Sequence, residues 1–225
     1  MIRAIATATL MTLTLASSAL ATNEQKCQQS LSIAASKYQL CMHVAQGKWL
    51  AAGDWMSYWM SIGKCITTYT QLWPRLTAKY AGQGTSCEGA RYVDNGDGTF
   101  YDRLTRLTWE KKDDAGGIHD KDNTYTWSTG NPWKETGTAF TTFLKTLNDG
   151  SFGGSNGWRM PSIYELSTLV EPAYPNCSSP PCTTVPGETF SSGYWSSSTY
   201  RDYPYNAWSV YFYNGSVDGS VSAWR

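Results

Sequence analysis

The feature that most restricts the fold of this 225-residue chain is its set of six cysteines behind an apolar N-terminal segment. Residues 1–21 combine Arg3, an uncharged run and the small-x-small triplet Ala19-Leu20-Ala21, a pattern typical of a secretory signal peptide. The uncharged run is too short to span a bilayer, which takes about 20 apolar residues. An exported chain with an even number of cysteines is expected to form disulfides. Zinc is disfavoured because the chain has no C-x-x-C pair and only two histidines.

Residues 22–86 are predicted to form a hairpin of two antiparallel helices. Apolar residues recur with a period near 3.6 from Leu31 to Met42 and again from Trp55 to Trp73. The chain is expected to reverse between Gly47 and Gly53. Pro74 is expected to bend the second helix or to end its regular hydrogen bonding, because proline has no N–H to donate.

The spacing of the cysteines predicts two nested disulfides across this hairpin. Cys41 and Cys65 are centred on Gly53, and Cys27 and Cys87 are centred on Ser57, so both pairs flank the expected turn. The predicted bonds are therefore Cys41–Cys65 and Cys27–Cys87, and each is expected to contribute about 2–4 kcal/mol to a small helical pair. A third bond, Cys177–Cys182, would pin a short loop. For the hairpin itself, a role as a stalk or spacer is favoured over a binding role.

From residue 87 onward the sequence changes to short strands separated by Gly, Asn and Asp. Residues 94–99, with the sequence DNGDGT, predict a turn between two strands of a hairpin. Leu104, Leu107 and Trp109 are expected to lie on a buried strand. The whole chain is therefore predicted to be α+β, with a helical hairpin of residues 22–86 followed by a domain of residues 87–225.

Two helices are predicted within this second region. Residues 139–147 place four apolar side chains on one helical face. A further helix begins after Ser162, which forms an S-x-x-E capping box with Glu165. Its core-facing residues are expected to be Ile163, Leu166, Leu169 and Val170.

The C-terminal segment predicts a hairpin with a two-residue type I′ loop at Asn214-Gly215. That loop would place Phe212 opposite Val217. It would also direct Tyr211 and Tyr213 away from the core. The remaining expected pairs are Val210 with Gly219 and Trp208 with Val221.

The motifs that could carry chemistry are weak. Residues 153–157 match G-x-S-x-G, but a buried strand before Ser155 and a later histidine are missing, so a flexible turn is expected. Hard oxygen ligands make Asp94, Asp97, Asp120 and Asp122 calcium candidates, although solvated turns are favoured because no twelve-residue loop ending in Glu is present. No metal or cofactor is therefore expected. A catalytic pair of carboxylates stays open, since spatial separation cannot be seen in the sequence.

Composition favours recognition over nucleic-acid binding. The formal net charge is zero, whereas nucleic-acid binders usually carry a basic surplus. The chain has 11 Trp and 15 Tyr, and these rings are concentrated after residue 90. Large amphipathic rings fill cores but also suit exposed recognition surfaces.

Five motifs occur in order in the second region: residues 93–99, 104–112, 158–162, 194–198 and 206–212. Together they resemble the Lcl C-terminal domain-like family over about residues 88–225. The resemblance implies a fold related to C-type lectins, with a mixed or antiparallel sheet and one or two helices. It also implies a bacterial surface or envelope location and binding of glycans or proteins.

The resemblance has limits that shape the expectations. The W-R-M-P-S segment is also similar to formylglycine-generating enzymes, but Cys177 and Cys182 do not match the setting of their cysteine pair. Members of the Lcl family commonly finish with a V-R-x-V-R strand, which does not follow the last hairpin here. Either the terminal strand is missing or the sequence is truncated, and an open sheet edge is expected in the first case. Neutral charge disfavours a sulfated polysaccharide, which would require clustered Lys and Arg.

The leading hypothesis is an exported binding or adhesion module of the periplasm, cell surface or extracellular space, and not an enzyme. Its partner would be a glycan or an envelope or host protein, with homo-oligomer formation left open. The alternatives are a formylglycine-generating-type or glycan-acting enzyme and a structural envelope component. The binding surface is predicted to contain seven aromatic residues: Tyr194, Trp195, Tyr200, Tyr203, Tyr205, Tyr211 and Tyr213.

Overall fold

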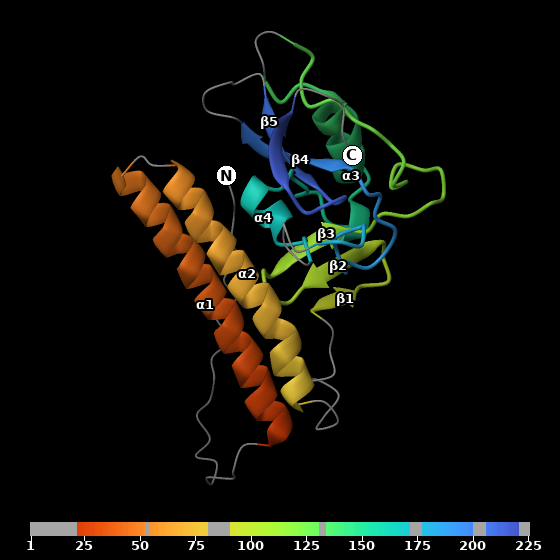
Figure 1. Ribbon diagram of the computed structural model, residues 1–225. Helices are drawn as coiled ribbons and strands as arrows, with labels where there is room; N and C mark the ends of the chain where they lie inside the picture. Colours follow the sequence, from red (N-terminus) through yellow and green to blue (C-terminus); the bar gives the residue numbers. More distant parts are fainter. Residues whose placement is uncertain are drawn as a thin grey trace, which may run out of the picture.

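Two long helices and two small antiparallel sheets form the framework of the chain (Figure 1). The computed structural model describes residues 22–52, 55–80, 91–130, 134–171, 177–199 and 206–220. Helices α1 (Asn23–Ala52) and α2 (Trp55–Tyr80) run side by side next to a globular part that contains the sheets. The predicted α+β class is confirmed.

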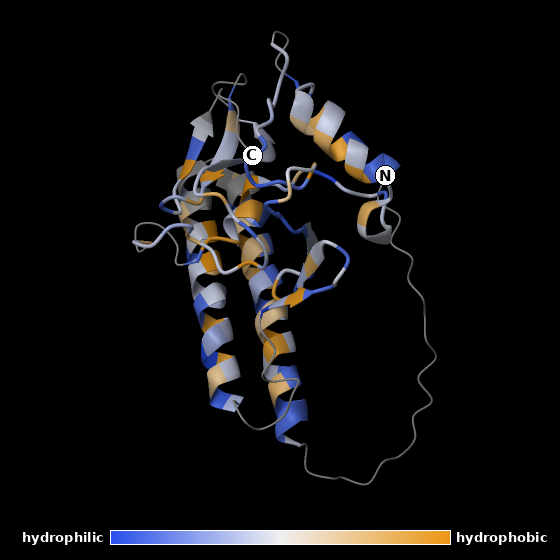
Figure 2. Ribbon diagram, turned by 90° about the vertical axis from the view of Figure 1, so that its right-hand side faces the viewer, coloured by the Kyte–Doolittle hydropathy of each residue, from blue (hydrophilic) through white to orange (hydrophobic). Residues whose placement is uncertain are grey.

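The hairpin is held by an apolar seam and by a disulfide. Leu31 and Tyr38 of α1 are buried together with Ile62, Ile66 and Trp73 of α2. Figure 2 shows apolar residues alternating with hydrophilic ones along both helices, as expected for helices that bury one side only. The Cys41–Cys65 disulfide joins the two helices with a Cα–Cα distance of 5.8 Å, which confirms the predicted pair.

Three details of the hairpin differ from the prediction or go beyond it. Gly47 lies inside α1, which continues to Ala52, so the expected break does not begin at Gly47. Likewise, α2 continues through Pro74 to Tyr80, because the packing of the hairpin outweighs the loss of one backbone hydrogen bond. Cys27 is fully buried and disulfide-bonded. Its predicted partner, Cys87, lies outside the described residues, so that pairing stays a prediction.

The first sheet is a meander of β1 (Tyr92–Asp94), β2 (Thr99–Asp102) and β3 (Leu107–Glu110). Asp94 pairs with Phe100 across the DNGDGT turn, which confirms the predicted hairpin. β3 begins at Leu107 and is only partly buried, and all four of its residues line a pocket. Leu104 precedes β3 in a turn and is completely buried against the helical hairpin.

Short helices connect the two sheets. The predicted helix of residues 139–147 is present as a π-helix, η1 (Ala139–Leu144), which continues directly into α3 (Lys145–Asp149). A single 3-10 turn, η2 (Phe152–Gly154), follows. The predicted capping box is also present, with Ser162 and Glu165 at the start of α4 (Ile163–Ser167). The four core-facing residues predicted for this segment, Ile163, Leu166, Leu169 and Val170, are all buried.

The second sheet contains β4 (Gly193–Thr199), β5 (Ala207–Tyr211) and β6 (Val217–Ser220), with β5 in the middle. Here the predicted register was wrong: Val210, and not Phe212, lies opposite Val217. The pairing is displaced by two residues. Because strand side chains alternate with a period of two, this displacement leaves each side chain on its predicted face.

The loop between β5 and β6 explains the displaced register. A type I′ turn needs positive φ at both central residues. Gly215 has φ of 77°, but Asn214 is not among the described residues with positive φ. Instead, residues 212–215 form a four-residue loop. The Gly215 N–H donates to the Tyr211 carbonyl at 2.7 Å, and the Tyr211 N–H donates to the Ser216 carbonyl at 2.9 Å.

Both faces of β5 are buried, which the sequence did not predict. Val210 packs in one apolar cluster with Leu166 and Leu169 from the α4 region. On the opposite face, Ala207 packs in a second cluster with Trp195. Tyr211 lies on the face opposite the cluster of Val210, as predicted, but that face is partly covered and Tyr211 is half-buried.

The helical hairpin and the globular part are in direct contact. Leu104 is buried in the same cluster as Leu31 and Tyr38 of α1. Gln39 also donates to the carbonyl of Thr105 at 3.4 Å. Among the described residues, none of the helices combines the length and the hydrophobicity needed to cross a bilayer.

A buried ion pair connects β2 to the segment after α4. Asp102 accepts Arg91 Nε at 2.9 Å and Nη2 at 2.7 Å, and its side chain has no exposed surface. Arg91 also donates to Glu171 and to the Thr168 carbonyl, the latter at 2.9 Å. Asp102 additionally accepts the Leu104 backbone N–H, so both oxygens are satisfied. This geometry meets the conditions under which a buried charge is tolerated.

We expect Asp102→Ala to lower the free energy of unfolding by about 3–5 kcal/mol, because Arg91 would be left buried without its main counter-charge. Urea denaturation followed by circular dichroism measures the change. Asp149→Ala is the matched control, since Asp149 pairs with Lys145 on the surface, where an exposed pair contributes about 1 kcal/mol or less. Equal losses from the two variants would contradict a structural role specific to the buried pair.

Candidate functional site

A pocket of about 300 Å³ lies between β3, the helical segment of residues 139–149, the region around α4, and β4. Most of its lining is apolar or aromatic, with a few charged side chains. Its main aromatic residues are Phe100, Trp109, Tyr125, Phe143, Trp158, Tyr194, Trp195 and Phe212. Its charged residues are Glu110, Lys112, Arg159 and Glu165.

Trp158 is held in place by three hydrogen bonds. The side chain of Asn148 donates to the Trp158 carbonyl at 3.0 Å and accepts its N–H at 2.8 Å. The indole N–H of Trp158 donates to the Phe152 carbonyl at 2.8 Å. Trp158 is therefore held in place before any ligand arrives, which limits the entropy lost on binding.

Tyr194 and Trp195 follow each other on β4 and are held by different contacts. The Tyr194 ring packs edge-on against Phe212 with 4.9 Å between centroids, and its hydroxyl accepts the Phe190 N–H at 3.1 Å. Trp195 is only 2% exposed, and its indole N–H donates to the Tyr125 carbonyl at 2.8 Å. Trp195 thus belongs mainly to the core, while Tyr194 is half-buried at the pocket.

Trp109 lines the pocket, but its indole nitrogen is enclosed by protein. This nitrogen is buried and has no hydrogen-bond partner among the described residues. A buried donor without a partner costs about 1–3 kcal/mol.

The charged side chains of the pocket pair with one another or with close neighbours. Glu110 Oε1 lies 3.2 Å from Lys112 Nζ and 3.0 Å from His119 Nδ1. Lys112 Nζ also lies 4.4 Å from the centre of the Phe143 ring, within the range of a cation–π contact. The pocket therefore has polar groups but no unpaired excess of either charge.

Arg159 and Glu165 form the second pair at the pocket. Arg159 donates to both carboxylate oxygens of Glu165, at 2.8 and 2.6 Å. Glu165 also accepts the Ser162 N–H at 2.8 Å as part of the capping box. Burial alone would raise the pKa of Glu165, but these donors outweigh burial and hold the pKa below its usual value.

The predicted aromatic surface is split by the structure. Tyr194 and Trp195 line the pocket. Tyr211 is half-buried in β5, and Tyr213 is 63% exposed on the loop of residues 212–215. The other three predicted residues, Tyr200, Tyr203 and Tyr205, lie outside the described residues.

Sequence reasoning did not assign Trp109, Trp158 or Lys112 to the site. All three belong to the ordered motifs of residues 104–112 and 158–162, so the motifs marked the correct segments. Their convergence depends on long-range packing between β3 and the segment before α4, which no local pattern reports.

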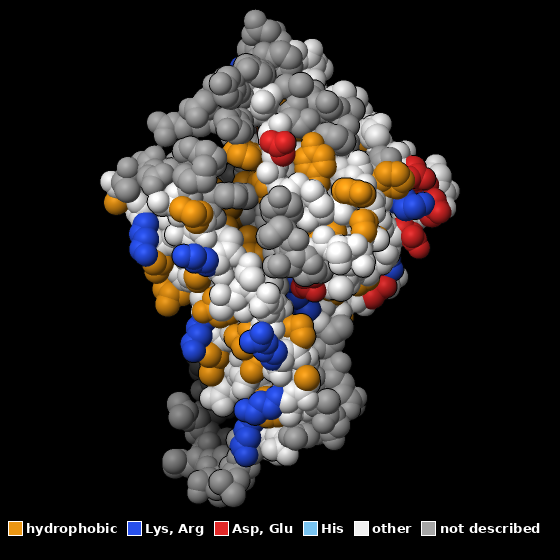
Figure 3. Space-filling model, viewed as in Figure 1, with side chains coloured by type: hydrophobic (Ala, Val, Ile, Leu, Met, Phe, Trp, Pro, Cys, Tyr) orange, Lys and Arg blue, Asp and Glu red, His pale blue; other side chains and the backbone are white. Residues whose placement is uncertain are grey.

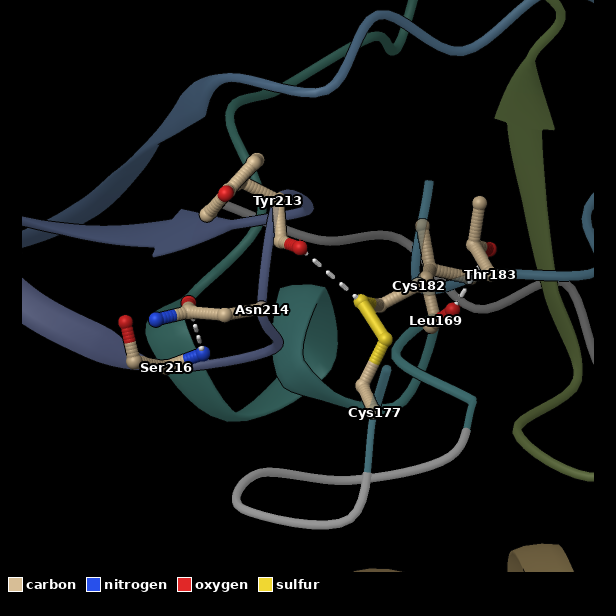
Figure 4. The surroundings of a disulfide bond; sticks show 7 residues. All are labelled: Leu169, Cys177, Cys182, Thr183, Tyr213, Asn214 and Ser216. Carbon is tan, nitrogen blue, oxygen red and sulfur yellow. Dashed lines mark hydrogen bonds between the residues drawn. A yellow bond between two sulfur atoms is a disulfide. The ribbon is translucent and has the colours of Figure 1, made fainter. Parts of the chain in front are cut away.

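The Cys177–Cys182 disulfide, also predicted, supports the loop that carries Tyr213 (Figure 4). The Cys182 N–H donates to the Phe212 carbonyl at 2.7 Å, and the Cys182 carbonyl accepts the Glu171 N–H at 2.8 Å. Cys182 Sγ also lies 3.3 Å from the Tyr213 carbonyl oxygen. The disulfide segment thus lies between the β5–β6 loop and the segment after α4.

The calcium candidates separate into two groups. Asp120 and Asp122 lie near Asp114, with oxygen atoms within 4.8 Å of one another. However, the Lys121 ammonium lies 2.5 Å from Asp114 and 3.6 Å from Asp122, and it supplies the positive charge there. Both oxygens of Asp120 accept backbone N–H groups.

The other two candidates, Asp94 and Asp97, stabilise the DNGDGT turn. Asp94 pairs with Lys111 and accepts the Gly96 N–H at 3.0 Å, and Asp97 accepts the Thr99 hydroxyl at 2.6 Å and the Thr99 N–H at 3.0 Å. These contacts hold the pKa of each carboxyl below its usual value. Their positions fit a turn, as favoured from the sequence.

The G-x-S-x-G segment is also a turn. Gly153 and Gly154 have φ of 56° and 74°, and the segment follows helix α3 and the η2 turn rather than a strand. A Cβ at Gly153 would lie 2.6 Å from Thr99 Cγ2, so close packing also requires glycine there. Ser155 accepts the Gly157 N–H at 3.2 Å.

The sequence of residues 98–223 matches the model of the Lcl C-terminal domain. Because this match covers more than half of the chain, the protein belongs to the Lcl C-terminal domain family. The matched range contains the pocket, the capping box and the β5–β6 loop. No curated protein and no solved structure matches the chain.

The capping box predicts a pH-dependent contribution to stability. Because the folded pKa of Glu165 is lowered, its contribution is complete above the unfolded pKa and is lost as pH falls through the folded pKa. We expect Glu165→Gln to be destabilising at neutral pH and progressively less so on acidification, as measured by urea denaturation across a pH series. A difference that stays constant with pH would contradict the role assigned to the carboxylate.

Removing the short disulfide should loosen the loop of residues 212–215. We expect Cys177→Ser to lower the free energy of unfolding by about 2 kcal/mol through loss of the cross-link. Hydrogen exchange should become faster in the loop and remain unchanged in α1, which is distant from it. The variant retains the buried Cys182 sulfur, so uniform acceleration along the chain would contradict this local role.

Proposed function

We propose that this chain is an exported binding module that holds a neutral, ring-bearing group of a glycan in the aromatic pocket. The observation that carries the proposal is a pocket lined by fixed aromatic rings whose charged groups are already paired. Aromatic faces bind the apolar face of a sugar ring without requiring charge. A volume of about 300 Å³ is at the lower end for small-molecule sites, which fits one ring better than a long chain.

Three contacts in the pocket suit a sugar. Trp158 and Tyr194 are both half-buried rings held by hydrogen bonds to the protein backbone. Trp109 adds a further aromatic side chain to the pocket wall. Lys112 and Arg159 add polar groups whose charges are balanced by Glu110 and Glu165.

The state of the two pocket carboxylates favours binding over catalysis. Glycoside hydrolysis requires one carboxylic acid that donates a proton and a second carboxylate that acts on the sugar or on water. Glu165 has a lowered pKa and is committed to Arg159 and the helix cap. Glu110 is committed to Lys112 and His119. Because both carboxylates are already engaged in structural contacts, the module is proposed not to be an enzyme.

Export and an adhesive role in the envelope or outside the cell are part of the same proposal. The apolar leader and the disulfides fit an exported protein. A C-type-lectin-like fold, implied by the family resemblance, would suit this role. Tyr213, exposed on its disulfide-supported loop, is proposed as a secondary contact for a larger glycan.

The test is a glycan array probed with residues 22–225, which include every residue that the structure describes. We expect saturable binding to neutral glycans that is unaffected by EDTA, because Lys121 supplies the positive charge in the Asp114 cluster. Tyr194→Ala should weaken binding by roughly tenfold or more, as for a buried aromatic anchor. Tyr213→Ala should cause a smaller loss.

Leu40→Ala is the control, since Leu40 is 64% exposed on α1, far along the chain from the pocket. Thermal melts would establish that each variant is folded. An empty array from folded protein would replace the glycan with a protein partner or a structural role, to be pursued by pull-down from the envelope. Hydrolysis of a bound glycan, or turnover of a sulfatase peptide, would overturn the proposal that the chain is not an enzyme.

A further inference from the structure

The net charge of zero is the sum of a basic N-terminal part and an acidic C-terminal part. The described residues of α1 and α2 include six basic side chains and a single acidic one, Glu24. Residues 88–225 contain 16 acidic and 11 basic residues. Figure 3 shows Lys and Arg side chains distributed along the hairpin, whereas the Asp and Glu side chains in that view lie on the globular part. The basic residues of the hairpin are Lys26, Lys37, Lys48, Lys64, Arg75 and Lys79.

The same hairpin exposes large apolar side chains. Ile33, Leu40 and Val44 of α1 are 46%, 64% and 50% exposed, although most of the large apolar side chains on the described chain are at least partly buried. Met60 of α2 is 56% exposed. Scattered exposed apolar residues are ordinary, but three on one helix face form a coherent surface.

The exposed lysines and apolar residues of α1 share one helix face. Positions 33, 37, 40, 44 and 48 are separated by three or four residues, the spacing that places side chains one above another on a helix. Lys37 and Lys48 are exposed, like the apolar residues between them. This face lies to one side of the seam with α2, where Leu31, Ala34 and Tyr38 are buried. It is called the outer face of α1 below.

We propose that the outer face of α1 binds the surface of an anionic phospholipid bilayer, with the hairpin lying along the membrane. Helices that lie in a membrane interface combine apolar side chains, which enter the headgroup region, with Lys or Arg, which contact anionic lipids. A soluble polyanion would use the lysines but would have no need for Ile33, Leu40 and Val44. The acidic surplus of residues 88–225 would direct the globular part away from the membrane.

This inference is independent of the glycan pocket. In this proposal the hairpin holds the module at a membrane surface while the pocket stays accessible. Such attachment is peripheral and reversible, and it requires no membrane-spanning helix.

The test is co-sedimentation of residues 22–225 with vesicles of phosphatidylcholine, with and without phosphatidylglycerol, at low salt. We expect binding only when phosphatidylglycerol is present, and loss of binding at high salt. Lys37→Gln combined with Lys48→Gln should weaken binding roughly twentyfold, because each lysine near an anionic membrane contributes about a factor of five. Leu40→Ser combined with Val44→Ser should weaken it roughly fivefold or more.

Lys145→Gln is the matched control, because it removes one exposed positive charge from the globular part. Absence of binding to the anionic vesicles, or an equal loss per charge from Lys145→Gln, would overturn the proposal. The proposal would also be overturned if the lysine variant lost binding while the Leu40 and Val44 variant bound normally. That result would mean that the attraction is purely electrostatic, as for a soluble polyanion. A change of oligomeric state in the lysine variants, without vesicle binding, would identify a second copy of the chain as the occupant.

Discussion

The guanidinium of Arg91 is buried where β2 meets the segment that follows α4, and a charge in that position is tolerated only if its partners are fixed. Asp102 supplies two oxygens, and Thr168 and Glu171 supply two more. Asp102 lies 11 residues from Arg91 in the chain, whereas Thr168 and Glu171 lie 77 and 80 residues from it. The turn after Asp102 also places Leu104 against the helical hairpin. One ionic contact therefore links the first sheet, the α4 region and α1.

A second arginine acts at the other end of α4. Arg159 holds Glu165 at the N-terminal capping box, while Arg91 holds Thr168 and Glu171 beyond the C-terminal end. The pocket is lined by residues of α4, which these contacts position, and of β3, which pairs with β2 where Asp102 lies opposite Leu107. Since the rings are fixed by the protein itself, little ordering is required when a ligand binds.

The pocket and the outer face of α1 differ in their balance of charge. Around the pocket, every charged side chain has a partner of opposite sign, so recognition depends on aromatic faces and a few donors. Along α1, exposed lysines stand beside exposed apolar residues, and among the described residues of the hairpin basic side chains outnumber acidic ones by six to one. The first arrangement suits a neutral ring and the second an anionic interface. Because the two surfaces use separate elements, each can be changed without disturbing the other.

Local sequence patterns were sufficient to predict the helical hairpin, its disulfide and the cap of α4. The 3.6-residue period and the cysteine spacing predicted the hairpin and Cys41–Cys65, and the S-x-x-E pattern predicted the cap at Ser162, because these features depend on residues close in sequence or on a single chain reversal. The aromatic content indicated a recognition surface, and the ordered motifs marked the segments that line the pocket. What the tertiary structure decided was which rings meet. Trp195 enters the core, Trp109 and Trp158 converge on the pocket, and Val210 replaces Phe212 opposite Val217. Each of these outcomes depends on packing between segments that are distant in the sequence. There, burial on both faces of a strand and the pairing of charges outweigh the preference of a residue for a particular local structure.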